Sequence, residues 1–202
     1  LVATLKALIG SSKNGKVTII AHSNGGLVAK ALLAKLQEMK TANAADDMID
    51  HIDTLVLVAS PQIGTAGALP AMLHGFDQSI LLGWLMDQEH ARELGRNMPG
   101  GYGLLPSKEY INRMSASPAT FSDNTVPSGV TTSFINAYGS VIDSYSEYKD
   151  FLFGAEGRTQ PAIYDTLLPI NLSTTLFNQA ETLHNKIDAW TPPQGLRVVE
   201  VA

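Results

Sequence analysis

The segment 21–26, AHSNGG, holds the residues best suited to chemistry in this 202-residue chain. It follows the pattern G-x-S-x-G, with Ala21 in the first small position. In this pattern a strand turns sharply into a helix, and the strained turn raises a serine side chain above the sheet as a nucleophile. Ser23 is therefore the predicted nucleophile.

The flanking residues predict the strand and the helix that such a turn requires. Residues 17–21, VTIIA, form a short apolar run rich in β-branched side chains, typical of a strand buried on both faces. The residues after Gly26 read as a mainly apolar helix. Because strand and helix nearly touch at the turn, we expect Ala21 and Gly25 to be the small residues it needs, and Gly26 to ease the helix against the sheet.

The helix start also predicts a site for developing negative charge. The first N–H groups of a helix lack internal acceptors, and the dipole is positive at that end. The backbone N–H of Asn24, the residue after the nucleophile, would stabilise the oxyanion of a tetrahedral intermediate. A serine that merely caps a helix would not need small neighbours, a buried strand before it and an apolar helix after it. The spacing of the glycines also argues against a phosphate-binding loop, because the segment matches neither G-x-G-x-x-G nor G-K-[ST].

The remaining pattern predicts a parallel sheet interrupted by a long insertion. Residues 55–59, LVLVA, form a second buried strand, which makes strand, helix and strand a right-handed βαβ unit. We expect residues 1–61 to be the central part of the sheet domain, 62–190 to be a mostly helical insertion, and 191–202 to return to the sheet with a strand at 196–201. Other helices are predicted over 1–9, 88–97 and 172–190.

Composition limits the classes of protein. Hydrophobic residues make up 45% and charged residues 16%, which suits a folded core. The net charge of −5, with no basic stripe, argues against a nucleic-acid partner. The chain has no cysteine, which excludes disulfides and thiolate metal sites.

We expect no cofactor and no metal. The aspartates at 46, 47, 50 and 53 lack the glycine and terminal glutamate of an EF-hand calcium loop. A solvated loop is the expectation for this acidic stretch.

Three segments resemble a known family. Residues 21–33, AHSNGGLVAKALL, look like the nucleophile turn of α/β-hydrolase lipases, and 55–69, LVLVASPQIGTAGAL, resemble the next strand and its P-x-x-G-T loop. Residues 97–107, NMPGGYGLLPS, are similar to a cap segment of the lecithin:cholesterol acyltransferase-like group, which includes phospholipid:diacylglycerol acyltransferases. The resemblance implies a partial α/β-hydrolase fold, a parallel sheet with a large helical cap at 62–190.

The same resemblance implies a serine hydrolase or acyltransferase that cleaves a lipid ester through an acyl-enzyme on Ser23, with the Asn24 N–H in the oxyanion hole. Hydrolysis and acyl transfer share this intermediate, so the sequence leaves both open. An esterase, amidase or thioesterase with a more polar substrate is one alternative. A non-catalytic binding module is another, although a serine at the nucleophile position argues against it.

A serine nucleophile needs a histidine base and an acid that orients it, in the chain order Ser, acid, His. The acid normally follows a strand after the cap, and the strand at 196–201 is followed only by Ala202. We therefore expect the acid and the histidine to lie outside this chain, and the chain alone to be inactive.

The five histidines of the chain receive other assignments. We expect His22 to pack beside the turn and His51 to lie on a solvated loop. His74 and His90 fall in the insertion. His184, flanked by Glu181 and Asp188, is expected on an exposed helix face.

The insertion also offers a candidate lid. The apolar segment 80–86 with Trp84 is either core or a lid that meets acyl chains or a lipid interface, with Gly75 and Gly83 as hinges. The aromatic segment 145–153 is either cap core or an acyl-facing wall. We expect a lipid or ester substrate and transient contact with a lipid interface through the cap. The sequence leaves open whether the protein is secreted or membrane-associated.

Overall fold

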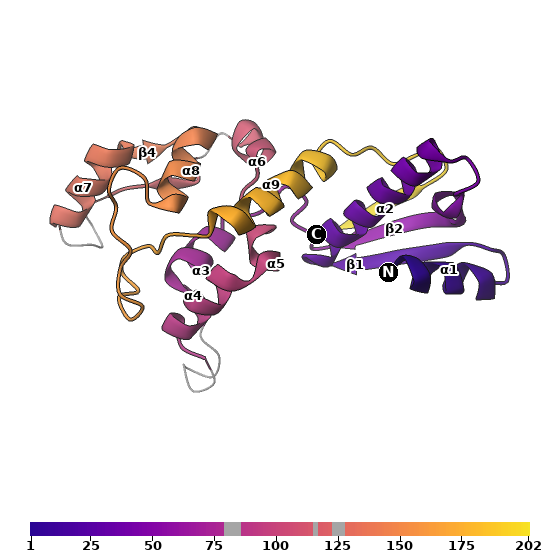
Figure 1. Ribbon diagram of the computed structural model, residues 1–202, viewed down its shortest axis with the longest axis horizontal. Coiled ribbons are helices and arrows are strands. Elements are labelled where there is room, and N and C mark those ends of the chain that lie inside the picture. Colours follow the sequence, from indigo (N-terminus) through magenta and orange to yellow (C-terminus); the bar gives the residue numbers. More distant parts are fainter. Residues whose placement is uncertain (79–85, 115–116, 123–127) are drawn as a thin grey trace. The chain divides into compact units, whose positions relative to one another are not determined.

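The computed structural model describes residues 1–78, 86–114, 117–122 and 128–202 (Figure 1). The chain divides into two compact units. The first joins Leu1–Gln62 to Thr182–Ala202, and the second is Ile63–Glu181.

The first unit is built on a parallel three-stranded sheet with the order β1-β2-β5. Its elements are α1 (Val2–Ser11), β1 (Val17–His22), α2 (Gly25–Ala42), the 3₁₀ helix η1 (Met48–His51), β2 (Ile52–Val58) and β5 (Arg197–Val201). Helix α9 (Thr174–Ile187) begins in the second unit and ends in the first. The predicted α/β class with a parallel sheet is confirmed, and α2 is the crossover between β1 and β2.

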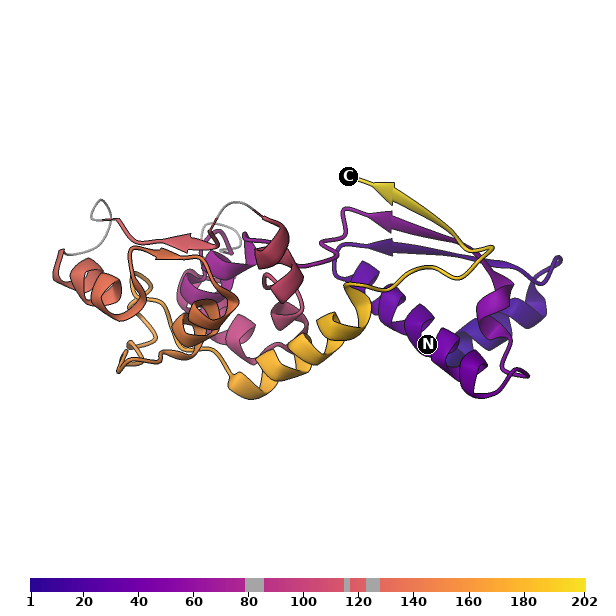
Figure 2. The same ribbon diagram turned by 90° about the horizontal axis from the view of Figure 1, so that it is seen from above.

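Both long helices of the first unit cover the same face of its sheet (Figure 2). Strand register places Ile19 beside Leu55 and Ala21 beside Leu57 on this face. The helices supply their apolar stripes to the same core. Its buried members include Leu5, Ala21, Ala29, Leu33, Leu36, Ile52, Leu55, Leu57 and Leu196.

The opposite face of the sheet is apolar but open among the described residues. Ile20, Val56 and Val199 lie side by side in register there. Ile20 is 73% exposed and Val201 is 47% exposed. The expectation that residues 17–21 are buried on both faces is therefore wrong for the described structure, because α1 and α2 lie on one side.

The second unit is mostly helical. Its elements are α3 (Ala68–His74), α4 (Gln88–Asn97), α5 (Pro99–Tyr102), α6 (Lys108–Arg113), β3 (Ala119–Thr120), α7 (Ser128–Tyr138), β4 (Val141–Ile142), α8 (Tyr145–Phe153) and the first part of α9. β3 and β4 form an antiparallel pair. The predicted helix at 88–97 is observed with those bounds. It is followed by the short helix α5, which begins with Pro99, a residue well suited to a first helical position.

Local signals explain where these helices begin and end. The Asp87 side chain accepts a hydrogen bond from the His90 N–H at 2.9 Å and caps α4. Ser144 and Glu147 form a capping box at the start of α8. Gly75, one of the predicted hinges, ends α3 with a φ of 68°, and a Cβ atom there would lie 2.0 Å from the Gln88 carbonyl oxygen. Close packing therefore accounts for this glycine without a hinge.

The predicted lid segment at 80–86 falls almost wholly on residues 79–85, which lie outside the described residues, as do Gly83 and Trp84. Among the described residues, no helix combines the length and the apolar character needed to cross a bilayer.

Candidate active site

Ser23 occupies the turn between β1 and α2. Its φ of 53° lies in the left-handed region, where a residue with a Cβ atom is strained. The turn is held on both sides, because the Ser23 N–H donates to the Val58 carbonyl at 2.9 Å and the Gly26 N–H donates to the Ser23 carbonyl at 3.0 Å. Strain of this kind costs of order 1–3 kcal/mol and concentrates at functional sites.

The structure places the closest approach of helix and sheet at Gly26. A Cβ atom on Gly26 would lie 2.4 Å from Ser60 Oγ and 3.1 Å from Leu57 Cδ2. Apart from its chain neighbours and the backbone of its own helix, no described atom lies within 4 Å of the corresponding position on Gly25. The expectation that Gly25 is the residue required to be small is therefore wrong for these neighbours, and Gly26 has that role. The reason is geometric, since Gly26 is the buried member of the pair and faces the end of β2.

Asn24 stands at the N-terminus of the 18-residue helix α2. Its φ of −54° and ψ of −23° are already helical, so the backbone turns fully at Ser23 and continues directly into α2. The backbone N–H of Asn24 belongs to the first turn of this helix. Groups in this position favour negative charge through their N–H bonds and the helix dipole. This is the electrostatic setting that an oxyanion donor needs.

The carboxyl ends of the three parallel strands meet at the edge that holds Ser23. Ala59, just after β2, is also in the left-handed region with a φ of 45°, and its N–H donates to the Val201 carbonyl at 2.7 Å. The Gln62 side chain donates to the Glu200 carboxylate at 2.7 Å. Ligands of open α/β sheets bind at this edge. The strain at Ala59 escaped sequence reasoning, because alanine carries no signal for a positive φ.

His22 lies on the open face of the sheet. Side chains alternate along a strand, so Thr18, Ile20 and His22 point away from the helices. His22 is exposed. The expectation that it packs beside the turn is wrong in the described structure, because nothing described covers this face.

His51 is half-buried and has structural contacts. Its Nδ1 lies 2.7 Å from the Gly15 carbonyl oxygen, and its Nε2 lies 3.6 Å from the Asp47 carboxylate. The ring joins η1 to the loop before β1. The expectation of a solvated loop histidine is therefore wrong.

His184 is buried, and the expectation of an exposed helix face is wrong. It is 5% exposed, and its Nδ1 lies 2.7 Å from Asp188 Oδ1. Along α9 the buried residues Phe177, Ala180, His184 and Ile187 recur at steps of three and four. That spacing is the stripe of a packed helix face, and it is the sequence signal that identifies His184 as buried.

A histidine oriented by a carboxylate through Nδ1 is the arrangement that a serine nucleophile requires of its base. The contacts shown for the Nδ1 atoms of His184 and His51 are with Asp188 and with the Gly15 carbonyl.

The other two histidines belong to the second unit. His90 is exposed and pairs with Asp87, and hydrogen bonds from its backbone and ring lower the pKa of the Asp87 carboxyl. The Nδ1 of His74 lies 2.9 Å from the Thr166 carbonyl oxygen. Burial lowers the pKa of His74, so the ring is held neutral.

The aspartates at positions 50 and 53 of the acidic stretch contact ordinary protein partners. Asp50 pairs with Lys40, and Asp53 accepts a hydrogen bond from Thr18 at 3.0 Å. Within the described ranges, no group of three or more acidic, histidine or cysteine side chains is arranged to hold a metal ion.

The fold and this turn together define a partial α/β-hydrolase fold. A model of the lecithin:cholesterol acyltransferase family matches residues 3–187, which is most of the chain. The chain therefore belongs to the lecithin:cholesterol acyltransferase family, and the resemblance inferred from the sequence is confirmed.

Two further comparisons add little. No protein with a curated description matches the chain. Among solved structures, a chain from "The crystal structure of Tle4-Tli4 complex" matches with 15% identity and a TM-score of 0.46. The match covers 96% of this chain and 39% of that chain.

Proposed function

We propose that Ser23 is the nucleophile of a serine hydrolase or acyltransferase that cleaves a lipid ester. The observation that carries the proposal is the φ of 53° at Ser23, a serine held in a strained turn between a parallel strand and the start of a long helix. Membership of the lecithin:cholesterol acyltransferase family supports acyl-ester chemistry in general.

In the proposed reaction the Ser23 hydroxyl attacks the ester carbonyl while a histidine base takes its proton. The N–H of Asn24, at the positive end of α2, stabilises the oxyanion of the tetrahedral intermediate. The base returns the proton to the leaving alcohol, which departs and leaves an acyl group on Ser23. Water or a second alcohol then releases the acyl group. We assign neither the base nor its acid to a residue of this chain.

A fluorophosphonate probe tests the nucleophile directly. The full-length natural protein should acquire one adduct, located by peptide mapping at Ser23, and Ser23→Ala should abolish it. Ser11→Ala, which removes an exposed hydroxyl at the end of α1, is the matched control and should leave labelling unchanged. Adduct formation elsewhere, or none, would favour the alternative of a non-catalytic binding module.

The position of the base has its own test. We expect the 202-residue chain alone to show no turnover, and His184→Ala in the full-length protein to retain the Ser23 adduct. Turnover of this chain that required both Ser23 and His184 would overturn the expectation that the base lies elsewhere. It would also assign the Asp188-paired imidazole as the base.

Substrate class separates the remaining alternatives. Esters of increasing chain length, offered below and above the concentration at which they form micelles, distinguish a lipase from an esterase for more polar substrates. We expect higher rates with long chains and aggregated substrate, in keeping with the proposed role of the second unit as a cap that meets a lipid interface. Adding an apolar alcohol and measuring new ester distinguishes transfer from hydrolysis.

A further inference from the structure

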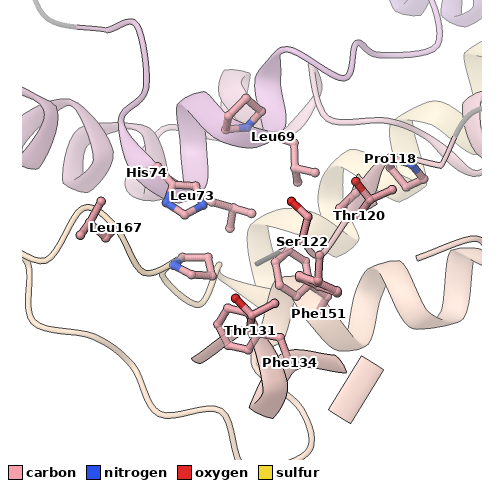
Figure 3. A pocket seen from close by; sticks show the side chains of 14 residues that line it. Leu69, Leu73, His74, Pro118, Thr120, Ser122, Thr131, Phe134, Phe151 and Leu167 are labelled. Carbon is pink, nitrogen blue, oxygen red and sulfur yellow. The ribbon is translucent and has the colours of Figure 1, made fainter. Parts of the chain in front are cut away.

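The second unit contains a pocket of about 380 Å³ formed entirely by its own residues (Figure 3). The volume lies within the range of small-molecule sites. The wall comes from α3, the β3 segment, α7, α8 and the loop before α9. Ten of the fourteen described lining residues are apolar, among them Leu69, Leu73, Phe121, Phe134 and Phe151.

Three phenylalanines give the pocket a fixed aromatic wall. The ring centroid of Phe121 lies 5.6 Å from that of Phe134 and 5.4 Å from that of Phe151. Phe134 and Phe151 meet edge to face at 6.3 Å. Such contacts hold the rings in place. The wall therefore suits a hydrocarbon chain.

Among the described residues that line the pocket, none has a charged side chain to receive an ionic group. Arg92 and Arg158 lie close enough to influence His74 electrostatically, but neither is among the lining residues. Their guanidinium groups already donate to backbone carbonyls. An anion or a cation in this pocket would lose its hydration without a charged partner. A neutral ligand is favoured.

The described lining has four polar side chains, those of His74, Thr120, Ser122 and Thr131. Thr131 and His74 are the two that are buried or half-buried. Thr131 is 1% exposed, and its hydroxyl has no hydrogen-bond partner in the described part of the chain. Figure 3 shows that hydroxyl directed toward the pocket interior. The Nδ1–H of neutral His74 donates to the Thr166 carbonyl, which leaves Nε2 as an acceptor. A buried hydroxyl without a partner is unusual in a native structure and calls for a ligand or another explanation.

We propose that this pocket binds an aliphatic alcohol, with its hydrocarbon chain against the phenylalanine wall and its hydroxyl hydrogen-bonded to Thr131. A hydroxyl both donates and accepts, as the Thr131 hydroxyl does, and it can also donate to His74. Binding of the alcohol in this pocket does not depend on Ser23 being a nucleophile. The proposal for the pocket is therefore independent of the proposed function.

Binding of decanol, measured by displacement of a fluorescent fatty-chain probe, tests the site. Decanol should bind more tightly than decanoate or decyltrimethylammonium, which share its chain and differ in charge. Thr131→Val keeps the shape and removes the hydroxyl, and should weaken decanol binding by about fivefold to tenfold, the equivalent of one hydrogen bond. Thr132→Val, an exposed neighbour on the same helix, is the matched control and should bind as the wild type does.

A photoreactive decanol analogue gives a second readout that does not depend on the folding of a variant. Cross-links should map to the lining residues in 69–74, 118–122, 131–134 and 167–169 or to Phe151. Tighter binding of decanoate, equal decanol affinity in Thr131→Val, or cross-links confined to other segments would overturn the proposal. The Ser23→Ala protein should bind decanol with unchanged affinity, which separates failure of this site from failure of the proposed nucleophile.

Discussion

A Cβ atom added to Gly26 would lie 2.4 Å from the Ser60 hydroxyl oxygen and 2.5 Å from the Ser60 Cβ. The first turn of α2 therefore touches Ser60, the second residue after β2, with no room for a methyl group. Backbone and side chain must shift to admit one, as in an overpacked core. We predict that Gly26→Ala lowers the free energy of unfolding by about 1–3 kcal/mol in urea denaturation.

The neighbouring glycine is the control for that substitution. Apart from its chain neighbours and its own helix backbone, Gly25→Ala meets no described atom within 4 Å. It should be neutral or slightly stabilising, because alanine restricts the unfolded chain. Ser60→Gly removes the atoms that clash, so the double variant with Gly26→Ala should recover most of the lost stability. Equal losses for both glycine variants would contradict the placement of the close contact at Gly26.

The positive φ of Ser23 predicts that glycine is more stable than alanine at this position. Ser23→Ala keeps the Cβ atom and the strain, whereas Ser23→Gly relieves about 1–2 kcal/mol of it. The greater conformational freedom of glycine in the unfolded chain offsets about 0.4–1 kcal/mol of this gain in stability. Ser23→Gly should therefore unfold with a free energy about 0.5–1 kcal/mol higher than Ser23→Ala. Ala59→Gly, at a φ of 45°, should stabilise similarly without loss of the Ser23 adduct.

The residue types around Ser23 made the turn predictable from sequence. A β-branched run, a serine and two glycines each favour a particular local backbone, so β1, the turn and α2 follow from short-range preferences. Which glycine is sterically required was not predictable, because the contact is made by Ser60, 34 positions away from Gly26. Long-range packing therefore determines which of the two glycines must lack a side chain.

The burial of the histidines also depends on long-range packing that the sequence does not reveal. The charged neighbours of His184 predict an exposed position, whereas the apolar stripe along α9 indicates burial. The place of His22 beside the turn predicts packing, yet the described residues leave its face of the sheet open. The polarity of neighbouring residues does not by itself predict whether a side chain is buried. Burial depends on which element packs over the side chain, and that element can be distant in sequence.

Arg92 should be a major source of stability in the second unit. Its guanidinium is fully buried and donates to four backbone carbonyls of the loop before α9, those of Ala162, Ile163, Asp165 and Leu168. Arg92→Met leaves these acceptors without their donor, at about 1–3 kcal/mol for a buried unsatisfied group. We predict a loss of at least about 2 kcal/mol, with faster amide exchange over 162–168. Arg96→Met, which removes only a surface pair with Glu93, should change stability by less than about 0.5 kcal/mol.

Burial of His74 should make folding sensitive to mild acid. Its pKa is lowered from 6.5 in the folded protein, so the unfolded chain binds more protons in the interval between the two pKa values. The contribution of His74 to stability is therefore complete above about 6.5 and is lost as the pH falls through the folded pKa. His74→Gln keeps a neutral donor for the Thr166 carbonyl and should flatten the decline between about pH 7 and about pH 5. Parallel stability curves for wild type and variant would contradict this expectation.

The chain offers two His–Asp pairs that have the same separation and different burial. His184 and Asp188 are 2.7 Å apart with side chains 6% and 10% exposed, and His90 and Asp87 are also 2.7 Å apart but with side chains 77% and 47% exposed. Water weakens the exposed pair, whereas the buried pair interacts in a lower dielectric. Double-mutant cycles with alanine should give a coupling of about 1–3 kcal/mol for His184 and Asp188. The coupling of His90 and Asp87 should be smaller and should fall further as salt is added. A buried pair with coupling no larger than the exposed one would show that burial does not strengthen the contact between His184 and Asp188.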